Sequence, residues 1–303
     1  MKHYSVMLNE TIESLNIKED GVYIDATLGA GGHTEQILKR LTTGHVIGFD
    51  KDADALKRTH ERLKPYGNLF ESVRGSYTQI EEVLAEKKIS EVDGIIFDLG
   101  VSSPQFDDPS RGFSYRFDER LDMRMDQRQK LSAYEVVNTY SESDLERILK
   151  DYGEERFAKG IARQICLARP LETTFDLVEA VKRAYPFKEM KKGHPAKQTF
   201  QAIRIEVNNE LGEVEDAIEQ AINSIKVGGR VVVLTFHSLE DRLVKKAFNK
   251  VGKPAKVNPR IPVAIEEELN YKVIVKGKKA SKEELKENNR SHSAILRVLE
   301  RVR

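Results

Sequence analysis

The chain of 303 residues has little that would cross-link or anchor it: one cysteine, no long hydrophobic run and no apolar leader. A single cysteine, Cys166, excludes an internal disulfide and a metal site built from several cysteines. The longest apolar runs, such as Val231–Leu234, are far too short to span a bilayer. The first residues do not resemble a signal peptide. These absences predict a cytoplasmic protein without a membrane partner and without a cysteine metal cage.

The net charge of +1 conceals an uneven distribution of charge. Residues 241–303 contain 17 lysines and arginines against 8 acidic residues, a balance of +9. The remainder has 33 basic and 41 acidic residues, a balance of −8. A basic C-terminal fifth favours a polyanionic partner, although a solvated lysine-rich surface is an equal alternative.

Strand-like and helix-like runs alternate through the first hundred residues. The expected strands are Val22–Leu28, His45–Asp50, Leu69–Val73 and Val92–Val101, and the expected helices are Thr34–Leu41, Asp52–Leu63 and Gln79–Lys88. Apolar strands separated by helices predict a parallel sheet covered on both faces.

The pattern then becomes helical from Ser132 to about Met190, with no convincing strand. A long helix is expected to run from Pro195 to about Ile225, followed by a strand at Arg230–Phe236. A single crossover needs far fewer residues than this interval. We therefore expect a discontinuous sheet domain, residues 1–107 and 195–303, interrupted by a helical domain at 108–194.

Two later strands, Tyr271–Val275 and Ala294–Leu299, are expected to complete the sheet. Between the strand at Arg230–Phe236 and these, Ser238-Leu-Glu-Asp241 predicts a helix start. Ser238 would cap that helix and Asp241 would reach back to it.

A glycine-rich turn, Asp25-Ala-Thr-Leu-Gly29-Ala-Gly31-Gly32-His33, follows the first expected strand. Glycines allow backbone to approach a ligand closely at a helix start. A nicotinamide fingerprint would need glycine at 34, where Thr34 stands, and the lysine of a P-loop is absent. An S-adenosylmethionine site tolerates this spacing, and Asp25 could bind the cofactor's ammonium. An ordinary strand-to-helix turn is the alternative.

Two more carboxylates end strands at the same predicted edge. Asp50 stands where it can accept hydrogen bonds from ribose hydroxyls, unless Asp52 takes this role instead of capping a helix. Asp98 ends the fourth strand. Three acidic strand ends along one edge are costly for folding alone, because buried carboxylates need partners. The ring of His33 is not expected to act as a base.

The loop Asp98-Leu-Gly-Val-Ser102-Ser103-Pro104-Gln105 indicates the chemistry. An exocyclic base amine is a poor nucleophile, so a site must accept its hydrogens and hold it in line with the methyl group. A carboxylate, hydroxyls and a proline-fixed carbonyl can do so. DNA amino-methyltransferases commonly have Asp, Asn or Ser followed by Pro-Pro-Tyr or Pro-Pro-Phe here, and this loop has only one proline.

The segment Arg111-Gly-Phe113-Ser-Tyr115-Arg-Phe117 interleaves arginines with aromatic rings. Such a combination can stack a splayed base and bind its phosphate. The alternative is an aromatic hinge that packs the inserted domain against the sheet domain.

The chain resembles the ribosomal RNA small subunit methyltransferase H family over nearly its whole length. The matching motifs are His3–Glu10, Asp25–His33, Gly94–Gln105, Arg111–Tyr115, Leu121–Asp126, His194–Ala196, Phe200–Ile205, Phe236–Arg242 and Arg290–Arg297.

The resemblance implies a Rossmann-like class I S-adenosylmethionine-dependent methyltransferase domain with an inserted, mainly helical substrate-recognition domain. It implies methylation of N4 of a cytidine in 16S rRNA near the decoding centre, at the ribosomal P site. It also implies that the cofactor site is lined by Gly31, Gly32, His33, Asp50, Tyr77, Asp98 and Gln105. Tyr77 stands where the family often has phenylalanine.

From the residues and the resemblance together, the chemistry expected is a direct displacement that demands no metal. Asp98 or the Ser102–Pro104 loop would accept hydrogen bonds from N4, and Arg290 and Arg297 would contact RNA phosphates. The sequence leaves open whether the substrate is naked RNA or an assembled small ribosomal subunit, and whether the chain forms a homodimer. A DNA amino-methyltransferase, a non-catalytic RNA-binding assembly protein and, more distantly, a nicotinamide dehydrogenase are the competing hypotheses.

Overall fold

The computed structural model describes residues 5–101, 103–191, 193–254 and 268–303, with the backbone alone at 103 and 104. Two compact units divide the chain, one from Met1–Gly100 and Leu211–Arg303, the other from Val101–Glu210. Among the motifs expected from the sequence, the first two residues of His3–Glu10 and all of Ser102 lie outside the described residues.

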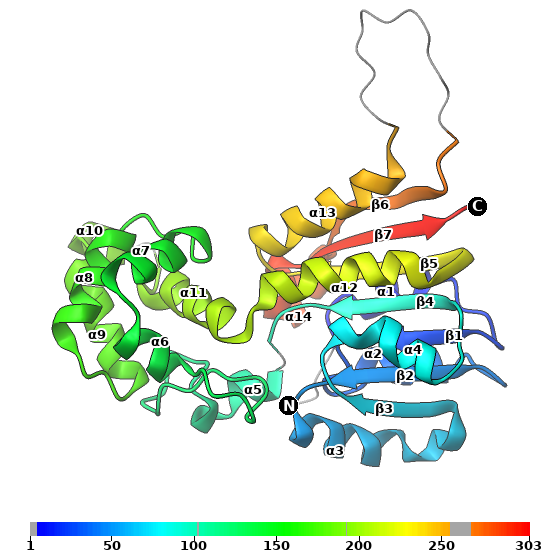
Figure 1. Cartoon of the computed structure of the whole chain (residues 1–303), viewed down its shortest axis with the longest axis horizontal. Coiled ribbons are helices and arrows are strands. Elements are labelled where there is room, and N and C mark those ends of the chain that lie inside the picture. Colours follow the sequence, from blue (N-terminus) through cyan, green and yellow to red (C-terminus); the bar gives the residue numbers. More distant parts are fainter. Residues whose placement is uncertain (1–4, 102, 192, 255–267) are drawn as a thin grey trace, which may run out of the picture. The chain divides into compact units, whose positions relative to one another are not determined.

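The first unit is built on a seven-stranded sheet with the order β3-β2-β1-β4-β5-β7-β6 (Figure 1). The strands are β1 Val22–Asp25, β2 His45–Asp50, β3 Phe70–Arg74, β4 Val92–Asp98, β5 Ile225–Thr235, β6 Tyr271–Lys279 and β7 Ile295–Arg301. Neighbours from β3 through β5 pair in parallel, whereas β7 runs antiparallel to both β5 and β6. The expected parallel sheet, and the two late strands that complete it, are therefore present.

Helices cover both faces of this sheet, as the apolar character of its strands predicts. The helices of the unit are α1 Leu8–Ser14, α2 Gly32–Leu38, α3 Ala53–Leu63, α4 Ile80–Glu86, α12 Glu210–Ser224, α13 Ser238–Gly252 and α14 Lys282–Glu287. One core cluster joins the sheet to α4, α12 and α13, and another joins it to α1, α2 and α3. Each large apolar side chain buried in these clusters contributes about 1.5–3 kcal/mol.

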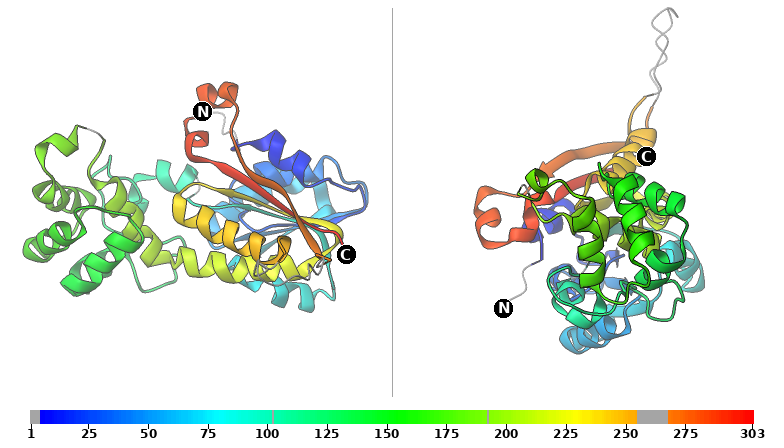
Figure 2. Two further views of the ribbon diagram at one scale, coloured as in Figure 1. Left: turned by 90° about the horizontal axis from the view of Figure 1, so that it is seen from above. Right: turned by 90° about the vertical axis from the view of Figure 1, so that its left-hand side faces the viewer.

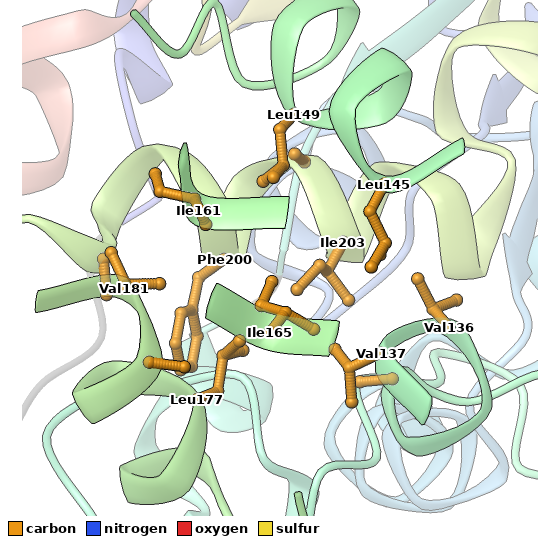
Figure 3. Packing of buried hydrophobic residues seen from close by; sticks show 14 of the residues in the cluster. Val136, Val137, Leu145, Leu149, Ile161, Ile165, Leu177, Val181, Phe200 and Ile203 are labelled. Carbon is orange, nitrogen blue, oxygen red and sulfur yellow. The ribbon is translucent and has the colours of Figure 1, made fainter. Parts of the chain in front are cut away.

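The second unit is helical, as the sequence pattern between Ser132 and Met190 predicts. Its helices are α5 Ser103–Asp107, α6 Ala133–Thr139, α7 Glu142–Asp151, α8 Ala158–Ala168, α9 Thr174–Ala184, α10 Phe187–Met190 and α11 Ala196–Asn208. Figure 3 shows Phe200 and Ile203 of α11 pointing among Leu145, Ile165 and Leu177 from three other helices. The helical unit thus has a hydrophobic core of its own.

The long helix expected from Pro195 to Ile225 is wrong, because two helices occupy this stretch. Asn209 adopts a left-handed backbone (φ 47°), which ends α11 before α12 begins. Since α11 packs in the helical core, the units divide at Glu210/Leu211, whereas the sequence placed the boundary at 194/195. The first division falls at Gly100/Val101 instead of 107/108.

The expected cap of α13 is also wrong. His237 is the N-cap, and its ring accepts a hydrogen bond from the Glu240 backbone N–H at 3.4 Å. The Glu240 carboxylate returns the interaction by accepting from the His237 backbone N–H, whereas Asp241 binds Arg297. The N-cap residue of a capping box is usually Ser or Thr. A box with histidine as the N-cap is therefore hard to predict from the sequence.

In the described part of the chain, no helix combines the length and the apolar character needed to cross a bilayer.

Candidate active site

Three carboxylates gather at one edge of the first unit's sheet. Because β1, β2 and β4 are parallel neighbours, their last residues, Asp25, Asp50 and Asp98, face the same edge. This is the edge at which ligands bind in open parallel sheets. Their surroundings differ, and the difference decides what each carboxylate can do.

Asp25 is buried and already satisfied by the turn that follows it. Its carboxylate accepts hydrogen bonds from the Thr27 backbone N–H at 3.1 Å and from the Thr34 hydroxyl at 2.6 Å. Burial raises the pKa of Asp25 to about 6, and these two donors partly oppose the rise. Thr34 thus occupies one of the oxygens expected to bind a cofactor ammonium, a contact that the sequence did not indicate.

Asp50 organises the glycine turn. One of its oxygens accepts from the Gly29 backbone N–H at 2.9 Å and the other from the Asp52 backbone N–H at 2.8 Å. Each carboxylate oxygen can accept a second hydrogen bond, so capacity for ribose hydroxyls remains. Burial is the main reason that the pKa of Asp50 rises to about 6. Asp52 caps α3 by accepting from the Asp54 N–H at 3.0 Å, which favours the capping role for that residue.

Asp98 differs from the other two carboxylates in having an oxygen to which no described residue donates. Its Oδ1 atom is buried and has no hydrogen-bond partner in the described part of the chain, while about 27% of the side chain is exposed. Burial raises the pKa of Asp98 to about 8, the charges of Asp25 and Glu240 add to the rise, and Arg290 opposes it. A buried acceptor without a partner is costly in an isolated protein and is suited to a ligand donor.

His33 lies beside Asp98, with Nδ1 at 3.6 Å from Asp98 Oδ2. Its other nitrogen, Nε2, is 3.3 Å from the Val6 carbonyl oxygen. Burial lowers the pKa of His33 to about 4, so the ring is neutral at physiological pH. Because a carbonyl only accepts, Nε2 carries the hydrogen, and the lone pair of Nδ1 faces Asp98.

The glycine turn is tight and is covered by the N-terminal segment. Gly29 and Gly31 have left-handed backbones, with φ of 49° and 72°, a conformation that favours glycine. A methyl group on Gly32 would collide with the Ser5 hydroxyl, so the Ser5 side chain lies directly against the turn.

Glu284 of α14 fixes this N-terminal segment from a distant part of the chain. One oxygen, Glu284 Oε1, accepts from the Met7 backbone N–H at 2.6 Å and from the Ser291 hydroxyl at 2.5 Å. Figure 2 shows α14 and the beginning of the described N-terminal segment at the same end of the sheet unit. No sequence signal identified Glu284 or Ser5, because both contacts depend on tertiary structure.

Tyr77 presents its ring at the start of a short 3₁₀ turn after β3. The ring meets Phe97 edge to face, with centroids 5.9 Å apart, and the ammonium of Lys51 lies 5.9 Å from its centre. Tyr77 follows β3, and its ring is half-buried. A flat aromatic surface of this kind can pack against a flat heterocycle.

Other residues expected at the site belong to the second unit. Gln105 is buried in α5, and Ser103 and Pro104 begin that helix. Arg111 and Phe113 are buried, and Arg111 donates to the Arg124 carbonyl at 2.9 Å. Burial makes these two side chains part of the helical unit's own packing, whereas the sequence suggested either an RNA contact or a hinge against the sheet domain.

Tyr115 is half-buried and stacks on His194, with centroids 4.1 Å apart and planes inclined by 12°. Of the two C-terminal arginines, Arg290 is exposed, whereas Arg297 is buried and binds Asp241 through two hydrogen bonds of 2.7 and 2.8 Å. An arginine engaged in this way has little freedom to contact phosphates.

Comparison with known proteins places the chain in a family. The model of the MraW methylase family matches residues 1–302. This chain belongs to the MraW methylase family. A relative from Clostridium botulinum (strain Kyoto / Type A2), named ribosomal RNA small subunit methyltransferase H, is 52% identical, with 99% of each chain covered. Another of that name, from Exiguobacterium sibiricum, is 51% identical and covers 100% of this chain and 99% of its own.

Among solved structures, that of an rRNA methylase from Streptococcus thermophilus covers 98% of this MraW-family chain and 94% of its own. Its sequence identity is 12% and its TM-score 0.44. The family model and the curated relatives confirm the resemblance drawn from the sequence motifs. The expected fold class, a Rossmann-like methyltransferase sheet with an inserted helical part, is also confirmed.

Proposed function

We propose that this chain transfers a methyl group from S-adenosylmethionine to N4 of a cytidine in 16S rRNA, near the decoding centre and the ribosomal P site. Membership of the MraW methylase family and the full-length relatives named ribosomal RNA small subunit methyltransferase H support this proposal. Within the chain, the supporting observation is Asp98, a strand-end carboxylate with a buried oxygen that lacks a partner in the described residues.

The sheet unit has groups that fit S-adenosylmethionine. The turn Gly29–Gly32 brings backbone close to a ligand, Asp50 can accept from ribose hydroxyls, and Tyr77 offers a ring for the adenine. Asp98 can accept from a cationic or N–H donor group, and Asp25 adds negative charge beside it. When bound, the cofactor supplies an electrophilic methyl group. Gln105 is proposed as a further lining residue, on the family resemblance alone.

The chain's own residues must make a weak nucleophile react. Asp98 accepts a hydrogen bond from N4, which orients the amine and favours the lone pair needed for attack. The new carbon–nitrogen bond would form as the bond between the methyl group and sulfur breaks, which would leave N4 with a surplus proton, and Asp98 in its ionised form would take that proton. Neutral His33, whose Nδ1 lies 3.6 Å from Asp98 Oδ2, carries its hydrogen on Nε2 and therefore donates none to the carboxylate. Ser102, Ser103 and Pro104 are proposed as additional acceptors for N4.

The cytidine would be turned out of its stack before reaching the sheet edge. Exposed Arg290, whose charge already acts on Asp98, is proposed to bind a phosphate next to the target. Tyr115 is a proposed base contact, and Arg111, Phe113 and Arg297 support the fold around these contacts. We further propose that the protein acts in the cytoplasm, with a homodimer as one possible assembly.

Methyl incorporation by the purified chain tests the proposal. Small ribosomal subunits from cells that lack the protein should accept a methyl group, and nucleoside mass spectrometry should identify N4-methylcytidine. Asp98→Asn should reduce the rate by about 10²–10³-fold, the usual loss for one electrostatic stabiliser. Glu61→Gln, at an exposed position on α3, is the control.

Three results would contradict the proposal. Methylation of duplex DNA instead of ribosomal subunits would identify a DNA amino-methyltransferase. Binding of RNA without any methyl incorporation would favour an assembly protein. N4-methylcytidine at an unchanged level in 16S rRNA from cells without this protein would assign the modification elsewhere.

A further inference from the structure

A groove opens along the antiparallel edge of the sheet, between α13 and β6, and we call it the β6–α13 groove. Its volume is about 210 Å3. Lys245 and Lys253 of α13 and its C-terminal cap line one side, and Lys276 of β6 lines the other. Phe248, Val273 and Arg297 also line it. Figure 1 shows α13 lying along β6 and β7.

The charge in this groove is positive, and the described residues leave it largely uncompensated. Lys245, Lys253 and Lys276 are exposed, and none of them forms an ion pair with a residue that the structure describes. Asp241, the carboxylate nearest to the groove's arginine, is already bound by Arg297 through two hydrogen bonds. Arg297 also donates to the Lys276 carbonyl, which fixes β6 against its neighbour at this point.

Strand β6 leads from the groove to the edge of the sheet that carries the candidate active site. In the strand register, Lys279 lies opposite Ile295, which in turn lies opposite Thr235 at the end of β5. One residue earlier on β5, Leu234 pairs with Asp98. Lys278 and Lys279 therefore stand at the Asp98 end of β6, about 7 and 10 Å along the strand from Lys276.

We infer that the β6–α13 groove binds RNA phosphates that flank the methylated nucleotide, with Lys278 and Lys279 leading from the active-site edge into it. This inference rests on the proposed function, since it gives the RNA of that reaction a path on the protein. Lysines without carboxylate partners bind a polyanion by releasing its counterions, with no need to read bases. The groove therefore supplies affinity, and the residues near Asp98 supply the choice of nucleotide.

Lysines on an edge strand have a simpler explanation, because they also discourage pairing with another sheet. That explanation does not require Lys245, which lies on α13, or Lys253, which is the C-cap of that helix. Both residues nevertheless line the groove. The helix positions therefore provide the sharper test.

The test compares two double variants of the full chain. Lys245→Gln/Lys253→Gln removes one lysine from a helix body and one from its C-cap. Lys57→Gln/Lys64→Gln makes the same change on α3 and its C-cap, at exposed positions. Binding of a 16S rRNA fragment is measured at several salt concentrations, and calorimetry with S-adenosylmethionine verifies that each variant is folded.

The groove variant should bind RNA more weakly, with the slope of log affinity against log salt reduced by about 2, roughly 1 for each phosphate contact. Its kcat at saturating RNA should be unchanged while KM for RNA rises. The α3 variant should match the wild type. Equal losses in both variants would overturn the inference, because total charge would then explain them. So would an unchanged slope in the groove variant.

Failure of the proposed function would look different. In that case the wild-type chain would bind RNA through the groove, with the same contrast between variants, and would incorporate no methyl group.

Discussion

Replacing Asp98 by asparagine should make the ligand-free protein more stable at neutral pH. Burial raises the pKa of Asp98 from its ordinary value of 3.8 to about 8. Between pH 3.8 and about pH 8, Asp98 holds a proton in the folded state that it releases in the unfolded state. The stability that Asp98 contributes is therefore fully present below pH 3.8 and is lost as the pH rises through 8. Asparagine keeps the shape of the side chain and removes the ionisation.

The magnitude follows from the two pKa values. At pH 7 the raised pKa of Asp98 lowers the free energy of unfolding by about 4 kcal/mol. Each pH unit above the unfolded-state pKa contributes about 1.36 kcal/mol to this loss. About 27% of the Asp98 side chain is exposed, so solvent screening reduces this loss of stability. We expect asparagine to raise the free energy of unfolding by about 2 kcal/mol more at pH 8 than at pH 5.

Urea unfolding of both proteins at pH 5, 6, 7 and 8 measures this difference. Glu61→Gln, on the exposed surface of α3, is the control and should stay within about 0.5 kcal/mol of the wild type at each pH. Asp25 and Asp50 also titrate, but they are present in both proteins and largely cancel. A gain that does not change with pH, or a loss of stability at pH 8, would refute the reasoning.

Three further substitutions test the surroundings of the site. Gly32→Ala should weaken S-adenosylmethionine binding in calorimetry, and adding Ser5→Ala should restore part of it, because the Ser5 hydroxyl is the atom in the way; a double variant no better than the single one would contradict this. Glu284→Ala should cost about 1–3 kcal/mol in urea unfolding, since two donors lose their acceptor, whereas exposed Glu283→Ala should cost almost nothing. Tyr77→Phe should keep donor affinity, and Tyr77→Leu should lower it by about two- to tenfold, the worth of an aromatic contact; equal affinities would remove the ring from the site.

The sheet and its acidic edge could be predicted from the sequence because both depend on local pattern. The run His45–Asp50 is apolar between its first and last residues, and the structure gives this strand the same bounds. A strand's carboxyl end is set by its own residues, and parallel pairing then brings such ends together. Asp25, Asp50 and Asp98 could therefore be expected on one edge before any contact between them was known.

The details that the sequence did not reveal depend on neighbours distant in the chain. Arg111 and Phe113 look like a nucleic-acid contact because their types and spacing suit one, yet both are buried within the helical unit. The apolar periodicity continues across Asn209, although the left-handed backbone of this residue ends one helix and separates it from the next. Periodicity of side chains does not reveal a break at a single residue. Thr34 satisfies Asp25 from the next helix, a pairing that no spacing rule marks.

The unequal satisfaction of the acidic edge has a consequence for ligand binding. Asp25 and Asp50 each accept two hydrogen bonds, whereas Asp98 has a buried oxygen without a partner in the described chain and a pKa raised to about 8. A positively charged donor near Asp98 favours its ionised form and must lower that pKa. Binding of S-adenosylmethionine at pH 7 should therefore release a proton, and affinity should rise with pH up to about 8.

Calorimetric titrations in two buffers with different heats of ionisation measure the released proton directly. The apparent binding enthalpy should differ between phosphate and Tris at pH 7, and the difference should disappear in Asp98→Asn. Asp25→Asn is the informative comparison, because Asp25 is satisfied by Thr27 and Thr34 within the turn and should release less. If the wild-type enthalpy is the same in both buffers, binding releases no proton, and the inference that the cofactor's charge lowers a raised pKa of Asp98 is refuted.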